Sequence, residues 1–220
     1  MDLNEKFKHF ADEEYESIDT VKDSIFHGKK ADYFAFDRSW ILEVKFLETD
    51  RRIQLNDFIN DLADNDPDLP VFFGTVSVER LIEKHKNPIL IRNILCNRFA
   101  RNLEALLRKA DKQILETKNV IDGHNTIGVV VILNERNDFH DQKFIYQEIS
   151  RLLHKVDEKG AFERENIQAV WYIHEYKGNN KKQCFSTFLI GPTANFDSVK
   201  SLADLLNMDW INYNGYTFSI

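Results

Sequence analysis

Two charged residues interrupt an aromatic-rich, otherwise apolar run in the first quarter of the chain: Glu43 and Lys45. Side chains alternate between the two faces of a β-strand, so residues two positions apart share a face. The spacing therefore predicts a carboxylate and an ammonium side by side, with Leu42, Val44 and Phe46 turned toward the other face.

A third charged residue, Asp32, lies in an upstream apolar run. Residues 31–37 and 40–48 are predicted to form two strands joined by a short turn, as in a hairpin. Such a hairpin would bring Asp32 beside Glu43, and two carboxylates suit a hard divalent cation such as Mg²⁺ or Mn²⁺. Lys45 would then stand beside the metal-bound water, lowering its pKa or orienting it to attack a phosphodiester. The alternative is an ordinary salt bridge on a strand.

The N-terminal segment, residues 5–26, has the periodicity of an amphipathic helix. Its expected apolar face comprises Phe7, Phe10, Ala11, Ile18, Val21 and Ile25. Glu14 falls in the middle of that face, where a carboxylate needs a partner or a metal, because burying an unpaired charge is costly. We expect Glu14 to join Asp32 and Glu43 around the cation. The alternative is a glutamate at the edge of the core with its carboxylate in water.

The longest helical pattern covers residues 88–118. Its predicted apolar face holds Phe99, Leu103, Leu106 and Ala110, and Gln113 lies on that face as well. Basic residues gather on the other side: Arg98, Arg101, Arg108, Lys109 and Lys112. Residues 86–112 carry seven Lys or Arg against two acids, a net +5, which leaves −12 for the remainder of the chain. This asymmetry is expected where one face meets a polyanion such as DNA, and the alternative is a solvated helix face.

The composition excludes several other classes of protein. The 220 residues are 43% hydrophobic and 30% charged, as in soluble globular proteins. There is no apolar run long enough to span a membrane and no apolar signal-peptide stretch. The two cysteines are far apart, so neither a disulfide framework nor a structural zinc site is indicated. Phosphate-loop, dinucleotide-binding, serine-hydrolase and HExxH patterns are missing. We therefore expect a cytoplasmic protein.

The remaining segments alternate between strand and helix patterns. Strands are predicted at 127–134, 168–176 and 184–190, and helices at 52–64, 141–156 and 197–207, with 70–78 a strand or part of an insertion. This order predicts an α/β fold with a mixed central sheet flanked by helices, in one domain spanning residues 1–220.

The order of these features resembles the PD-(D/E)xK nuclease superfamily, which has the restriction-endonuclease-like fold. The matching features are a helix with Glu14, a strand with Asp32, a strand with Glu43-Val44-Lys45, a helix with Gln113, and the strand 128–134. The resemblance covers about residues 10–135. Two departures are Ala31, where the family pattern has proline, and an apparent insertion at about residues 64–90.

The resemblance implies Mg²⁺- or Mn²⁺-dependent cleavage of DNA. By resemblance, Asp32 and Glu43 bind metal with Glu14, Lys45 positions the attacking water, and Gln113 completes the catalytic set. The expected partners are DNA and, as an open alternative, a second copy of the chain in a homodimer. A second hypothesis is a catalytically silent member of the fold that binds nucleic acid or a protein partner. A third is an unrelated α/β binding domain.

Overall fold

The computed structural model describes residues 1–21, 29–47, 66, 82–123, 125–135, 142–177 and 182–216. Within these ranges six strands form one sheet, whose spatial order follows the chain. The strands are β1 (Glu16–Ser17), β2 (Tyr33–Ala35), β3 (Trp40–Phe46), β4 (Ile127–Glu135), β5 (Ala169–Lys177) and β6 (Lys182–Ile190). Strands β1 to β3 form an antiparallel meander, β3 to β5 are parallel, and β6 returns antiparallel to β5. The expectation of a mixed α/β sheet is confirmed.

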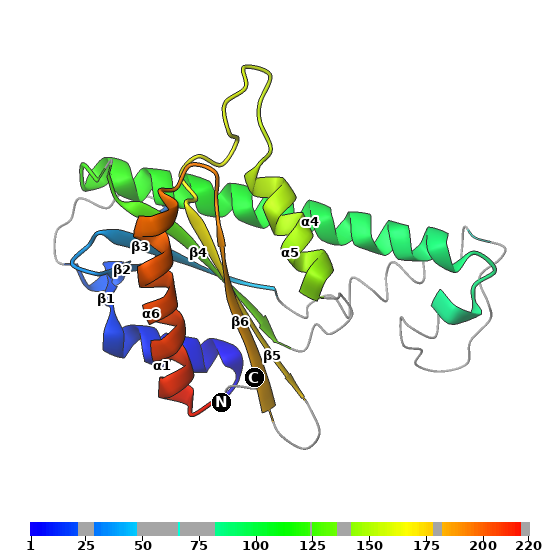
Figure 1. Ribbon diagram of the computed structural model, residues 1–220, viewed down its shortest axis with the longest axis horizontal. Helices are drawn as coiled ribbons and strands as arrows, with labels where there is room; N and C mark the ends of the chain where they lie inside the picture. Colours follow the sequence, from blue (N-terminus) through cyan, green and yellow to red (C-terminus); the bar gives the residue numbers. More distant parts are fainter. Residues whose placement is uncertain are drawn as a thin grey trace.

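Helices cover both faces of the sheet (Figure 1). They are α1 (Leu3–Glu14), the 3₁₀ turn η1 (Ile18–Thr20), α4 (Pro88–Val120), α5 (Gln142–Leu153) and α6 (Phe196–Asn214). One core, which includes Ile41 and Val130, lies between the sheet and helices α4 and α5. The other core, which includes Leu42 and Trp171, lies between the sheet and helices α1 and α6. Odd-numbered residues of β3 therefore face α4, as the alternation of side chains predicts.

Helix α1 is shorter than the predicted helix over residues 5–26. It begins with a capping box between Asp2 and Glu5 and ends at Glu14, because the chain next pairs with β2 as β1. Phe7 packs in the core on the α6 side, whereas Ile18 packs in the core on the α4 side. The apolar residues that look like one helix face thus belong to two cores on opposite faces of the sheet.

Helix α4 begins where its sequence predicts and ends two residues later than expected, at Val120 rather than at residue 118. The Asn87 side chain caps its start by accepting a hydrogen bond from the backbone N–H of Leu90, at 3.1 Å, and Pro88 occupies the first turn. Buried residues then recur at helical spacing along its whole length. Leu107 is fully buried where Leu106 was expected, and Leu106 is only partly buried. The first half of α4 extends past the edge of the strands (Figure 1).

The other predicted elements match to within a few residues, except that α6 continues to Asn214 rather than ending at residue 207. The Asn195 side chain caps the start of α6 by accepting a hydrogen bond from the backbone N–H of Ser198. The predicted helix at 52–64, the segment 70–78 and most of the insertion at 64–90 lie outside the described residues. None of the described helices is both long and apolar enough to cross a membrane.

Candidate active site

The side chains of Glu43 and Lys45 lie together on the face of β3 that packs against α4. Their neighbours across the parallel strand β4 are Val130 and Ile132, which line the core on that side. The Lys45 Nζ donates a hydrogen bond to the Glu43 Oε1 and forms an ion pair with this carboxylate. The predicted shared face is confirmed.

Asp32 is held next to this pair by three hydrogen bonds. Its backbone N–H donates to the Leu42 carbonyl, and its own carbonyl accepts from the backbone N–H of Ile18, both at 3.0 Å. Its carboxylate Oδ2 accepts from the backbone N–H of Val44 at 2.7 Å. Since Val44 lies between Glu43 and Lys45, the Asp32 carboxylate is anchored at the centre of the strand segment that bears the pair.

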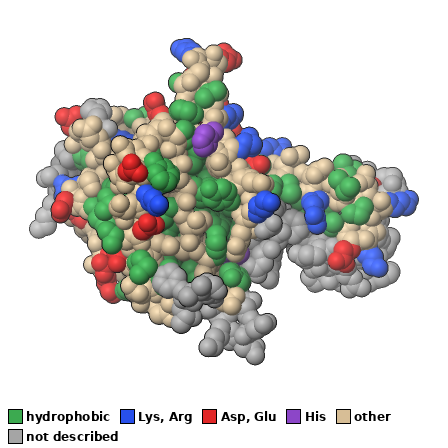
Figure 2. Space-filling model, viewed as in Figure 1, with side chains coloured by type: hydrophobic (Ala, Val, Ile, Leu, Met, Phe, Trp, Pro, Cys, Tyr) green, Lys and Arg blue, Asp and Glu red, His purple; other side chains and the backbone are tan. Residues whose placement is uncertain are grey.

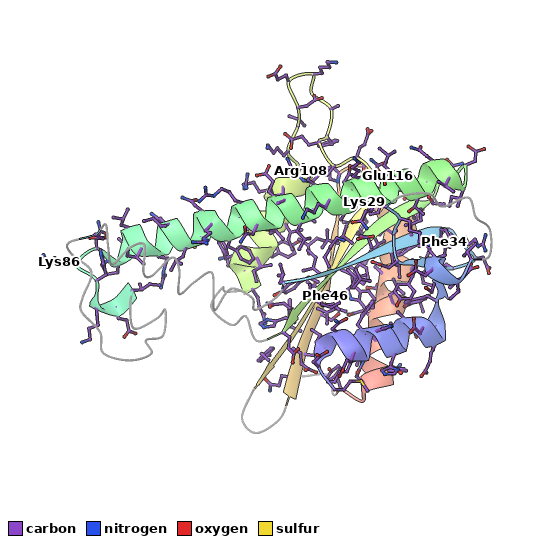
Figure 3. The ribbon with its side chains drawn as sticks, turned by 180° about the vertical axis from the view of Figure 1, so that it is seen from behind. Lys29, Phe34, Phe46, Lys86, Arg108 and Glu116 are labelled. Atoms are coloured by element: carbon purple, nitrogen blue, oxygen red, sulfur yellow. The ribbon has the colours of Figure 1, made fainter. Side chains whose placement is uncertain are left out.

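Gln113 reaches the same cluster from α4, which runs beside β3 and contacts it (Figure 3). Its side-chain Oε1 accepts from the Lys45 Nζ at 3.0 Å, and its Nε2 donates to the Lys30 carbonyl at 2.9 Å. The residues Asp32, Glu43, Lys45 and Gln113, which come from three separate segments, therefore meet in one place. We name this group the Asp–Glu–Lys–Gln cluster.

Burial, which has the largest effect, and the nearby Asp32 charge together raise the pKa of the Glu43 carboxyl to about 8, although the hydrogen bond and charge of Lys45 lower it. The Glu43 side chain is only 1% exposed. Burial also raises the pKa of Asp32, which the Val44 N–H and the Lys45 charge partly offset. Both carboxyls therefore resist ionisation in the absence of a further positive charge.

One oxygen of each carboxylate is left without a hydrogen bond among the described residues. The Glu43 Oε2 is buried and unpartnered, and the only hydrogen bond to the Asp32 side chain within the described ranges goes to its Oδ2. Mg²⁺ is bound in proteins through one or two carboxylates and keeps several waters. A Mg²⁺ or Mn²⁺ ion held by these two oxygens would keep several waters, and its charge would relieve the cost of burying the Glu43 anion.

Contrary to our expectation, Glu14 does not join the cluster. It is the last residue of α1 and is exposed, and its charge acts on Tyr15 and Tyr213 rather than on Asp32 or Glu43. The chain leaves the helix at this point, so the extrapolated helix face no longer applies. In the described part of the chain, no group of three or more His, Cys, Asp or Glu side chains is arranged to hold a metal ion.

Asp19 is the acidic residue that the sequence analysis missed. It lies in η1, its charge raises the pKa of Asp32, and its Oδ1 forms an ion pair with the Lys30 Nζ at 2.9 Å. Its side chain is 85% exposed, so it stands at the solvent rim of the cluster. No periodicity distinguishes it, because its position depends on where the chain turns after α1.

The outward face of α4 is basic, as predicted. Arg101, Arg108, Lys109 and Lys112 are exposed, and Arg98 is half-buried. The two acids of this stretch are paired with residues outside α4: Glu104 contacts Lys155 and Arg164, and Asp111 accepts hydrogen bonds from Asn166. Lys112 alone of the four exposed cations has an ion pair in the described part of the chain, with Glu116 at 3.7 Å. We name these four exposed residues the basic stripe.

The face on the α6 side differs from the basic stripe. Figure 2 shows acidic and basic side chains interspersed there with hydrophobic ones. Phe99, the only aromatic residue of α4, is buried. The stripe therefore offers cations for phosphates and no exposed ring on which bases could stack.

Comparison of the chain with known proteins finds no matching protein family, no matching curated protein and no matching solved structure. The Asp–Glu–Lys–Gln cluster and the basic stripe beside it are the two features of the molecule that bear on its function.

Proposed function

We propose that the chain is a metal-dependent nuclease that hydrolyses phosphodiester bonds in DNA, with a restriction-endonuclease-like core. The observation that supports this best is the buried Glu43 carboxylate, whose Oε2 has no hydrogen-bond partner in the part of the chain that the structure describes, although Lys45 and Asp32 lie beside it. An unsatisfied buried oxygen is costly unless a ligand completes it. The order of α1, the β1–β3 meander, α4 and parallel β4 agrees with the proposed core.

Asp32 and Glu43 would hold the Mg²⁺ ion. When bound, this ion supplies positive charge that stabilises charge developing on phosphate oxygens and favours ionisation of a coordinated water. The ammonium of Lys45 has three N–H donors. Two of them are directed to Glu43 and Gln113, which leaves the third to orient a water molecule or a phosphate oxygen.

Gln113 sets the direction of the Lys45 ammonium, since its own amide is fixed by the bond to the Lys30 carbonyl. Lys112, the next residue along α4, belongs to the basic stripe, so the stripe leads up to the cluster. From Arg101 to Lys112 the helix rises about 16 Å at 1.5 Å per residue. A nucleic-acid backbone held along this length would have a phosphate near the two carboxylates.

The test is cleavage of supercoiled plasmid DNA in Mg²⁺ or Mn²⁺, with EDTA as the metal-free control. Glu43→Gln and Lys45→Met should each lower the rate by at least about 100-fold, the scale of a lost catalytic group. Glu158→Gln is the matched control, because Glu158 is exposed and far along the chain from the cluster.

Metal-dependent cleavage that survives in both cluster variants would contradict the proposal and indicate a contaminating nuclease. Retained DNA binding with no cleavage under any metal would favour the alternative of a catalytically silent nucleic-acid-binding member of the fold.

A further inference from the structure

The peptide group between Lys30 and Ala31 is held at both ends by α4. Its carbonyl oxygen accepts from the Gln113 Nε2 at 2.9 Å, and its N–H donates to the Thr117 Oγ1 at 2.8 Å. Residues four positions apart lie on one face of a helix, so Gln113 and Thr117 can bind the C=O and the N–H of the same peptide group. This arrangement is a clamp, which we name the Gln113–Thr117 clamp.

Thr117 is itself fixed in place. Its side chain is fully buried, and its hydroxyl donates to the Gln113 carbonyl at 2.9 Å while it accepts from Ala31. The hydroxyl proton is therefore committed to the helix and the oxygen lone pair to the clamped peptide. The bond to the Gln113 carbonyl is local to the helix, whereas the bond from the Ala31 N–H connects the helix to the segment that bears Asp32.

The clamped peptide ends at Ala31, the residue before Asp32. Beyond it, the backbone of Asp32 is tied to Leu42 and Ile18. The clamp thus fixes the backbone that leads into Asp32, while Gln113 also accepts a hydrogen bond from the Lys45 ammonium. One helix face therefore sets the positions of both the metal-binding carboxylate and the lysine.

The clamp also explains a departure from the family that the sequence resembles. Ala31 occupies the position of the family's proline, and its N–H is the donor to Thr117. Proline has no backbone N–H. With proline at this position, the buried Thr117 oxygen would lose its donor, so the alanine and the threonine form a matched pair in this chain.

We propose that Thr117 is a positioning residue of the active site, which acts through the Lys30–Ala31 peptide to hold Asp32 in register with Glu43 and Lys45. The effect on cleavage rests on the proposed nuclease function. The effect on metal binding rests on the metal site of that proposal but not on cleavage, and the effect on the backbone rests on neither, so the three effects are measured separately.

The experiment compares Thr117→Val, which keeps the shape and removes the hydroxyl, with Thr117→Ser, which keeps the hydroxyl. In Thr117→Val we expect amide hydrogen exchange at Ala31 to accelerate about fivefold to tenfold, the scale of one lost hydrogen bond. Mn²⁺ affinity measured by calorimetry should fall, and kcat for plasmid cleavage should fall while KM stays within about twofold. Thr117→Ser should restore all three.

Unchanged Ala31 exchange and unchanged Mn²⁺ affinity in Thr117→Val would overturn the clamp. If wild-type protein binds Mn²⁺ but cleaves nothing, the nuclease proposal fails while exchange and calorimetry still decide the clamp. Should Thr117→Val not fold, as judged by circular dichroism, Thr117→Ala replaces it, and the exchange rate of Ala31 relative to other buried amides is the measurement that decides.

Discussion

Glu43 should destabilise the folded protein when no metal is bound, and Glu43→Gln should therefore raise stability. Burial and Asp32 raise the pKa of this carboxyl from an ordinary 4.5 to about 8. The folded state then binds the proton more tightly than the unfolded state, so this group lowers stability as the pH rises from about 4.5 to about 8. Above that range the loss is complete.

The size of the effect follows from the pKa difference. At pH 7 the unfolded carboxyl is almost fully ionised, whereas the folded one keeps most of its proton, and the difference amounts to about 3 kcal/mol. Glutamine has the same shape, and its side-chain oxygen still accepts from the Lys45 Nζ. We expect Glu43→Gln to gain roughly 1–3 kcal/mol at pH 7, or a Tm about 3–10 °C higher for a chain of this size.

The assay is guanidinium chloride unfolding of the wild type, Glu43→Gln and the surface control Glu158→Gln at pH 5, 7 and 9. The gain in Glu43→Gln should be small at pH 5, larger at pH 7 and largest at pH 9. Saturating Mg²⁺ should stabilise the wild type more than the variant, because a ligand that binds only the folded state adds to stability. A Glu43→Gln protein that is less stable than the wild type at pH 9 would refute this account of the carboxyl.

Three further results are expected. The first concerns a triple variant of the basic stripe: Arg101→Ala, Arg108→Ala and Lys112→Ala. The slope of log affinity for duplex DNA against log salt concentration should become flatter by up to about 3, and affinity should fall equally for all sequences. Titration of labelled duplex at several salt concentrations measures both. Glu14→Gln should cleave plasmid within about twofold of the wild type, since Glu14 is exposed and away from the cluster, and a 100-fold loss in the same plasmid assay would contradict that placement. Asp19→Asn should lower the pKa of Asp32 toward its ordinary value, because it removes a neighbouring negative charge. Titration followed by carboxyl ¹³C NMR measures this pKa, and an unchanged value would contradict the prediction.

The local part of the cluster was predictable from the sequence. The alternation of side chains along a strand places Glu43 and Lys45 on one face whatever the tertiary structure. A short hairpin turn then brings Asp32 opposite them, and the bond from its N–H to the Leu42 carbonyl follows from that register. Gln113 was predicted through the family resemblance, because a residue so far along the chain has no spacing rule that would bring it to the strand.

The prediction for Glu14 was wrong for a non-local reason. No Gly or Pro interrupts residues 5–26, so the local pattern gives no sign that the helix ends at Glu14. The end is set by the pairing of β1 with β2 and by burial of Ile18 on the other side of the sheet from Phe7. Helical periodicity cannot distinguish one apolar face from two half-faces that pack against opposite sides of a sheet.

The three functional features of α4 are coupled because they belong to one rigid helix. Lys112 faces outward in the basic stripe, Gln113 contacts Lys45, and Thr117 holds the peptide that precedes Asp32. Consecutive helix residues point about 100° apart, so these directions are fixed relative to one another. A shift of α4 against β3 would therefore displace the basic stripe, the lysine and the carboxylate together. Under the proposed nuclease function, correct placement of a DNA backbone would then coincide with correct assembly of the cluster.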